Sequence, residues 1–212
     1  MTTSKTKIAA TLGVAALLFF AAKDARSQQT TDDSGVIVDD EQLLNDPRIR
    51  AFLWAIRMCE HSPSDVYAGR DYRTFYGGSH LNDLSDHPLN TGEKEGVQLP
   101  REICLAAGFI SGYCVSTAAG AYQFIIGTWR ELAEQSPELP DFSPRSQDLA
   151  AVRLLRETGA IEPLLNNDPE TAFKKASIRW ASLPFSTAQQ RPKPLDYALA
   201  KYSEGMSLEA GA

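Results

Sequence analysis

Glu60 is the side chain best placed for acid–base chemistry. It follows Phe52 and Ile56 at intervals of four residues, so it leaves the same face of a predicted helix as these apolar side chains. A carboxyl group half-buried at the C-terminal end of a helix is disfavoured in its charged form by desolvation and by the helix dipole. Both effects raise the pKa, as general acid catalysis near neutral pH requires. The same spacing allows a simpler interpretation, in which the helix has already ended and Glu60 only solvates its end.

No other set of residues matches a common catalytic or metal-binding motif. The three histidines, His61, His80 and His87, are not spaced as metal ligands, and neither an H-E-x-x-H nor a G-x-S-x-G motif is present. A nucleophile at Cys59 would need a partner histidine that the sequence does not identify. We therefore expect no metal ion and no cofactor.

Two polar clusters are candidates for a binding site. Asp83, Asp86 and His87 lie in LNDLSDHP, and Ser116 and Thr117 precede a glycine. Each cluster also has a structural interpretation, because Asp and Ser bind their own backbone in turns and Ser and Thr cap helices. The clusters could therefore line a sugar site, or they could stabilise a turn and cap the following helix.

The helix that carries Glu60 is the first element that must position these groups. An Asp cap at Asp46, followed by Pro47, predicts its first turn. Residues 62–118 are rich in glycine and lack helical periodicity. This pattern predicts loops and short strands, including a hairpin around Gly108.

Four further helices are predicted in the C-terminal half from apolar residues at helical spacing. They are a helix over residues 122–133, a helix capped by Ser143-Pro144 and closed by Gly159, a helix capped by Asp168-Pro169 and stopped by Pro184, and a helix from Leu195 to Tyr202 that ends at Gly205. The expected architecture is α+β, mostly helical with a small irregular β region after the first helix. We expect one domain over residues 46–205 and a tail over 206–212.

The N-terminal residues differ in composition from the rest of the chain. Two lysines precede an uncharged run over residues 8–22, and small residues follow before Gln28, which predicts a secretory signal peptide over residues 1–27. A retained signal-anchor is the alternative, although a membrane span needs about 20 residues. Residues 28–45 are predicted to form an acidic linker, with a partly docked segment within it as an alternative. We expect export to the periplasm or cell wall, with membrane contact only through the N-terminal segment.

The formal net charge of −6 argues against a nucleic-acid partner, because such proteins carry an excess of Lys and Arg to neutralise phosphates. Cleavage before Gln28 would remove four Lys or Arg residues and one Asp, and would leave a charge of −9. We further expect a monomer.

The cysteines leave two alternatives open. In an exported protein, Cys104 and Cys114 would pair in a disulfide and Cys59 would be left over. In the other alternative, all three are reduced residues of the core.

Seven segments of the chain, taken in order, resemble the phage lambda endolysin family of peptidoglycan lytic transglycosylases over roughly residues 48–205. The segments are RAFLWAIRMCEHS (50–62), YRTFYGG (72–78), LSDHP (84–88), STAAGAYQF (116–124), DFSPRSQD (141–148), GAIEPLL (159–165) and WASLP (180–184). Each motif alone is weak, but their order and spacing make the match specific.

The resemblance implies a lysozyme-like fold and a single acid/base residue, Glu60. In such enzymes this Glu protonates the glycosidic oxygen between N-acetylmuramic acid and N-acetylglucosamine. It then acts as a base while the muramic C6 hydroxyl attacks C1, which leaves a 1,6-anhydro end. A second carboxylate, which two-carboxylate glycosidases require, is not needed.

The resemblance also implies a set of residues that shape or line the substrate cleft: Tyr72, Asp86, His87, Ser116, Tyr122, Gln123 and Gln190. This chain departs from the family pattern at three places. His61 stands where the family has glycine after its catalytic Glu, residues 185–189 replace a stretch with Gly and Tyr, and residues 93–115 form a longer lip loop.

Two other functions fit the same sequence. A hydrolytic muramidase would combine Glu60 with Asp65, Asp83 or Asp86, and a non-catalytic wall-binding or assembly protein could share the fold. The biological setting is predicted to be phage lysis by an endolysin with its own export signal. The alternative setting is remodelling of the wall by a bacterial enzyme.

Overall fold

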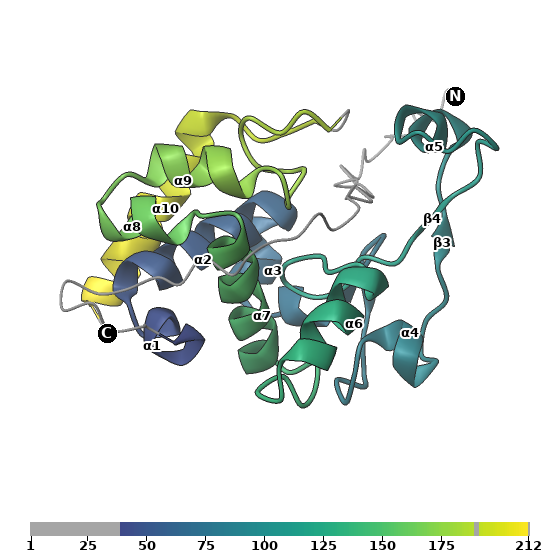
Figure 1. Ribbon diagram of the computed structural model, residues 1–212, viewed down its shortest axis with the longest axis horizontal. Coiled ribbons are helices and arrows are strands. Elements are labelled where there is room, and N and C mark those ends of the chain that lie inside the picture. Colours follow the sequence, from purple (N-terminus) through teal and green to yellow (C-terminus); the bar gives the residue numbers. More distant parts are fainter. Residues whose placement is uncertain (1–38, 189–190, 212) are drawn as a thin grey trace, which may run out of the picture.

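Helix α2 (Pro47–Glu60) runs through the centre of the fold (Figure 1). The computed structural model describes residues 39–188 and 191–211. The helix begins as predicted, because Asp46 accepts a hydrogen bond from the backbone N–H of Arg48 and proline occupies the first turn. Ile49, Phe52 and Ile56 are fully buried. The apolar stripe read from the sequence is therefore the core face of this helix.

Helix α10 (Leu195–Ala210) packs along α2 and corrects one prediction. The sequence predicts that this helix ends at Gly205, but it continues for one further turn. Gly205 lies where the two helices approach each other closely. A Cβ atom on this residue would lie 2.8 Å from Cα and 3.0 Å from the carbonyl oxygen of Ala51. The glycine therefore permits close packing instead of ending the helix.

The folded body begins earlier than predicted, with a short helix inside the expected linker. Helix α1 (Asp40–Leu44) starts with a capping box between Asp39 and Gln42. Its Asp40 binds Arg153 and Arg156 of helix α7 (Pro144–Glu157), which fixes α1 against the helical body. The predicted signal peptide and the remainder of the linker lie outside the described residues. Within the described ranges, no helix is long and apolar enough to cross a membrane.

In the part of the chain that the structure describes, the helical body contains four other helices. They are α6 (Ile126–Gln135), α7 (Pro144–Glu157), α8 (Ile161–Leu165) and α9 (Pro169–Ala176), of which α8 was not predicted from the sequence. Ser143 and Asp168 cap α7 and α9 as expected. Two boundaries differ from the prediction. Helix α6 begins after the predicted start at residue 122, because residues 120–123 form a turn, and α9 ends before Trp180, whose indole N–H binds the carbonyl of Tyr122.

The β region consists of two small antiparallel pairs with short helices around them. The pairs are β1 (Thr74–Phe75) with β2 (Ser79–His80), and β3 (Val97–Gln98) with β4 (Val115–Ser116). The short helices are α3 (Pro63–Tyr67), η1 (Asp71–Arg73), α4 (Pro88–Thr91) and α5 (Arg101–Ala106). The predicted hairpin around Gly108 is present as β3 and β4, but α5 and a loop connect its strands instead of a tight turn.

A disulfide between Cys104 and Cys114 closes this second hairpin, and Cys59 is free and buried in α2. Leu99 and the two bridged cysteines form a small core of their own, separate from the main core. Figure 1 shows α5 at the far end of the β3–β4 ribbon, away from helices α1, α8 and α10. We call residues 97–116 the arm.

Replacement of Gly205 by Ala is expected to destabilise the fold by about 1–3 kcal/mol, because the added methyl group meets the backbone of α2. Chemical denaturation measures this change. Gly127→Ala is the matched control. Gly127 also lies in a helix, but a Cβ there meets no atom within 4 Å, so this change should leave stability equal or slightly higher. Equal stability of the two variants would contradict the close approach.

Candidate active site

Glu60 is the last residue of α2, and its carboxyl group is partly buried. Its Oε1 atom accepts a hydrogen bond from the hydroxyl of Ser182 at 2.5 Å. Burial raises the pKa of Glu60 to about 7, whereas the Ser182 hydrogen bond and the nearby charge of Lys193 lower it. Near neutral pH the group can therefore be protonated and can also give up its proton.

Ser182 and Lys193 were not predicted from the sequence as parts of the site. The backbone N–H of Lys193 donates to the carbonyl of Ser182 at 2.7 Å, which holds the two residues together beside Glu60. Lys193 also lies over the ring of Tyr197, with Nζ 5.5 Å from the ring centre. Ser182 is 122 positions from Glu60, so no local spacing rule relates them. The only available signal was the WASLP segment, which contains Ser182.

His61 anchors the end of α2 to the loop over residues 116–124. Its Nε2 atom lies 3.2 Å from the carbonyl oxygen of Gly120 and 3.1 Å from that of Ala121. Both partners are acceptors, so Nε2 carries the proton and donates it. Burial is the main cause that lowers the pKa of His61. This residue therefore acts as a neutral hydrogen-bond donor that fixes the helix end.

A second anchor lies one turn earlier on the same helix. Arg57 donates to both carboxylate oxygens of the buried Asp71, at 2.6 Å and 3.1 Å. Its guanidinium group also lies 4.3 Å from the ring centre of Tyr72. Together with His61, this ion pair holds the last turn of α2 against the β region, and so fixes where Glu60 emerges.

Gln147 on α7 determines the shape of the loop that His61 contacts. Its Oε1 accepts from the N–H of Ala121 at 2.8 Å, and its Nε2 donates to the carbonyls of Tyr72 and Phe142 at 3.0 Å and 2.8 Å. A Cβ on Gly120 would lie 2.2 Å from the Gln147 Oε1, and Gly120 has a φ of +75°. Only glycine therefore fits this position. The segment DFSPRSQD includes Gln147, but its role was not predicted.

Gln123 is the predicted site residue that remains partly accessible within this loop. It adopts a positive φ of 49°, which is uncommon for a residue with a side chain. Its Nε2 donates to the carbonyl of Gly120 at 2.9 Å. The side-chain amide thus stabilises the turn that brings residues 120 and 121 to His61.

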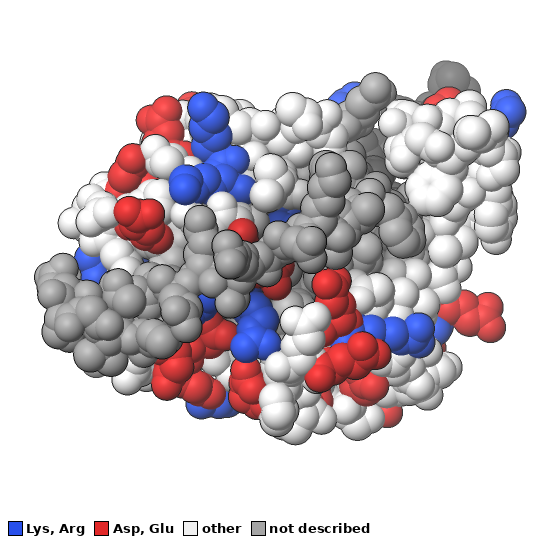
Figure 2. Space-filling model, in the orientation of Figure 1, with Lys and Arg blue, Asp and Glu red and all other residues white. Residues whose placement is uncertain are grey.

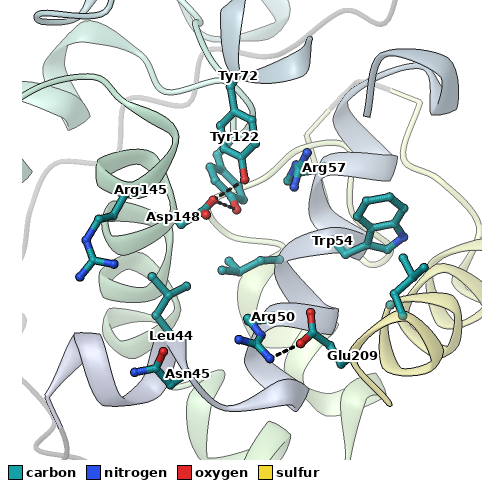
Figure 3. A pocket seen from close by; sticks show the side chains of 13 residues that line it. Leu44, Asn45, Arg50, Trp54, Arg57, Tyr72, Tyr122, Arg145, Asp148 and Glu209 are labelled. Atoms are coloured by element: carbon teal, nitrogen blue, oxygen red, sulfur yellow. Dashed lines mark hydrogen bonds and ion pairs between the residues drawn. The ribbon is translucent and has the colours of Figure 1, made fainter. Parts of the chain in front are cut away.

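Tyr72 and Tyr122 meet at a single half-buried carboxylate, that of Asp148. Their hydroxyls donate to Oδ1 of Asp148 at 2.8 Å and 2.6 Å (Figure 3). Tyr122 is only 1% exposed, so of the two predicted roles, shaping or lining the cleft, its burial fits the first. These residues, with Trp54 and Arg57, line a pocket of about 400 Å³ beside α2, and Glu60 is not among the residues that line it.

Three other predicted cleft residues, two of them buried and Asp86 partly exposed, bind groups of the protein itself. His87 and Ser116 are fully buried. The His87 Nε2 binds the carbonyl of Phe124 at 3.1 Å, and burial is the main cause that lowers the pKa of His87 to about 4. Oδ1 of Asp86 accepts from the Trp129 indole at 2.8 Å. In this structure their polar groups bind neighbouring segments, so they support the shape of this region.

The structural interpretation of the Ser116-Thr117 pair is confirmed for Thr117. Its Oγ1 accepts a hydrogen bond from the N–H of Ile126, the first residue of α6, at 3.0 Å. Gln190, the last predicted cleft residue, lies outside the described residues. Among the described residues, no group of three or more His, Cys, Asp or Glu side chains could hold a metal ion.

The carboxylates considered as a second catalytic group are already bound to other groups. Asp65 accepts from the hydroxyl of Ser62 at 2.6 Å and pairs with Arg70. Asp83 accepts from a backbone N–H at 2.8 Å, and Asp86 accepts from an indole, a backbone N–H and an amide. Hydrogen bonds lower the pKa of Asp65 and Asp83, in contrast to Glu60. Of these four carboxyl groups, Glu60 is the one suited to act as an acid.

Comparison with known proteins places this arrangement in one family. The endolysin family model matches residues 50–207. The endolysin of Escherichia phage lambda is 32% identical over 133 residues, which cover 63% of this chain and 73% of the relative. The endolysin of Escherichia phage P2 is 36% identical over 116 residues, which cover 55% of this chain and 63% of the relative.

Solved structures show the same fold. The lysozyme of bacteriophage lambda in complex with a chitohexasaccharide matches with a TM-score of 0.61 and 30% identity, over 76% of this chain and 94% of that one. A second structure of lysozyme from bacteriophage lambda matches with a TM-score of 0.55 and 27% identity, over 79% and 96%. The predicted lysozyme-like α+β fold is therefore confirmed.

Replacement of Glu60 by Gln is expected to stabilise the folded protein at pH 8. The carboxyl has a pKa of about 7 when folded and an ordinary value of 4.5 when unfolded. Between these values the folded state binds more protons than the unfolded state, so stability falls as pH rises through this range. The amide removes this penalty, which we place at about 1–2 kcal/mol because solvent partly reaches the group.

Denaturation of both proteins at pH 8 and pH 4 measures this effect. The gain should be present at pH 8 and largely absent at pH 4. Glu134→Gln, at an exposed position of α6, is the control and should show no comparable gain. The same difference between Glu60→Gln and the parent at both pH values would contradict the raised pKa.

Proposed function

The chain belongs to the endolysin family of cell-wall-degrading enzymes, and we propose that it is a lytic transglycosylase with Glu60 as its single acid/base residue. Its substrate is the glycan strand of peptidoglycan, cleaved between N-acetylmuramic acid and N-acetylglucosamine. The lambda lysozyme structure with a bound chitohexasaccharide supports an oligosaccharide as the class of ligand.

The reaction follows from the surroundings of Glu60. The protonated carboxyl group gives its proton to the glycosidic oxygen while the bond from that oxygen to C1 breaks. The hydroxyl of Ser182 and the charge of Lys193 stabilise the carboxylate that forms. The carboxylate then takes the proton of the C6 hydroxyl, whose oxygen attacks C1 and closes the 1,6-anhydro ring. No water is consumed, and Glu60 ends protonated as it began.

The single observation that carries this proposal is the contrast between Glu60 and its candidate partners. Glu60 has a raised pKa and a donor that stabilises its charged form. Asp65, Asp83 and Asp86 each accept hydrogen bonds from other groups of the protein. A mechanism that needs one carboxyl group fits this arrangement better than one that needs two.

A hydrolytic muramidase is the second candidate, because Glu60 could equally activate a water molecule. The two candidates give different products: transglycosylation leaves anhydro ends, and hydrolysis leaves reducing ends. We further propose that the enzyme acts as a monomer without metal or cofactor. In this proposal residues 1–27 export it to the periplasm, where it serves phage lysis.

Mass spectrometry of the muropeptides released from purified peptidoglycan tests the proposal. The full chain should release fragments with anhydro-muramic ends. Glu60→Gln should release them about 10²–10⁴-fold more slowly, because it keeps the size of the side chain but removes the acid. Reducing ends would establish the hydrolytic alternative, and no release by folded protein would favour a binding role.

Removal of the Ser182 hydroxyl is expected to move the alkaline limb of the activity profile to higher pH. The hydroxyl lowers the pKa of Glu60, so Ser182→Ala should raise it and keep the acid protonated over a wider range. From the strength of a hydrogen bond to a charged group, the limb should move by about one pH unit. Ser207→Ala, at an exposed position of α10, is the control and should leave the profile in place.

A further inference from the structure

The arm carries an unusual share of the exposed apolar side chains. Among the described residues, eight large hydrophobic side chains are exposed, and four of them belong to the arm. They are Val97 at 39%, Leu105 at 44%, Ile110 at 95% and Tyr113 at 58% exposed. Ile110, at the outer turn, touches almost nothing. These side chains do not belong to the core of the arm, which is formed by Leu99 and the two bridged cysteines.

The surface of the arm is also almost uncharged, whereas the chain as a whole is acidic. No Asp, Glu, Lys or Arg occurs from Ile103 to Trp129. Figure 2 shows this part of the molecule as mostly white, with charged groups only at its edges. Arg101 is one of these, and its methylene groups lie beside the turn at Gly112. The tip is therefore an apolar surface with one cation, Arg101, and one anion, Glu102, at its border.

We propose that the tip of the arm, formed by Leu105, Ile110 and Tyr113, inserts into the interfacial layer of a lipid membrane. The inference does not depend on how the enzyme cleaves glycan. It adds a membrane contact to the one predicted for the N-terminal segment.

The shape of the tip favours lipid over a second copy of the chain. The three exposed side chains offer on the order of 400 Å², about half of what each partner buries in a standard protein interface. The tip is the end of a projecting hairpin (Figure 1). A fluid layer closes around such an apolar projection, and tyrosine and arginine suit the polar border of that layer.

The disulfide makes insertion possible without a change of fold. The bond between Cys104 and Cys114 holds both sides of the tip together at its base. Ile110 is already exposed before any contact, so the tip needs no rearrangement to enter lipid. Because the chain carries −6, its overall charge is repelled by anionic lipid. Attraction at the tip is therefore apolar, independent of anionic lipid and only weakly sensitive to salt.

A tryptophan placed at the tip reports this contact locally, whatever the N-terminal segment does. In the full chain, Ile110→Trp is mixed with phosphatidylcholine vesicles that contain brominated acyl chains. The added indole should shift its emission to shorter wavelength and lose about half of its fluorescence, as expected for a ring at the acyl boundary. Ile178→Trp is the matched control, since Ile178 is 54% exposed but lies after α9, outside the arm. Its added indole should be unaffected, and both variants share the three native tryptophans as background.

Several outcomes would overturn the proposal. Absence of quenching at position 110 while the chain floats with the vesicles would show that lipid is contacted elsewhere. A blue shift without lipid that grows with protein concentration would assign the tip to a second copy. A shift with purified peptidoglycan but not with lipid would assign it to the wall. Cleavage of lipid-free peptidoglycan, measured on the same samples, tests the proposed function separately.

Discussion

The last turn of α2 is held from two sides. Arg57 and His61 bind the β region through Asp71 and the carbonyls of Gly120 and Ala121. Between them in the sequence, the carboxyl group of Glu60 meets the hydroxyl of Ser182. A rotation of the helix end would therefore break an ion pair and several hydrogen bonds. These interactions are partly buried, so breaking each one costs more free energy than it would at the surface. The raised pKa of Glu60 depends on this confinement.

Buried polar side chains support the loops around the site. Gln147 binds three separate segments at once, and Asp148 accepts hydrogen bonds from two tyrosine hydroxyls. Asp86 and His87 perform a similar role for the segment before α4. Such networks specify one loop arrangement because each unmade bond would leave a buried polar group unsatisfied. Residues attributed to substrate contact can thus shape a site without touching the substrate.

The arm is organised differently from the rest of the protein. The main body buries its apolar side chains around α2, whereas the arm has a small core that the disulfide closes. A segment this small buries little apolar surface, so a covalent link supplies stability that packing alone would not. The small size of this core also leaves apolar side chains exposed at the tip.

Local rules determined much of the fold from the sequence. The start of α2, its buried stripe, the place of Glu60 on that stripe and the caps at Ser143 and Asp168 depend on residues within about one helical turn, where spacing and capping act. The family and its fold also followed from the order of short motifs. The sequence therefore predicted the helix that carries Glu60, the proposed acid, and the face of that helix from which it emerges.

Tertiary structure decided what surrounds that acid. Ser182 lies 122 positions from Glu60 in the sequence. A hydrogen bond from the backbone N–H of Lys193 to the carbonyl of Ser182 holds Lys193 near the same site. Gly205 looked like a helix end, although it is the point where two helices approach each other. Tyr122, one of the candidates for sugar contact, is buried. These features depend on which distant segments pack together, and packing is a property of the whole chain that no local spacing contains.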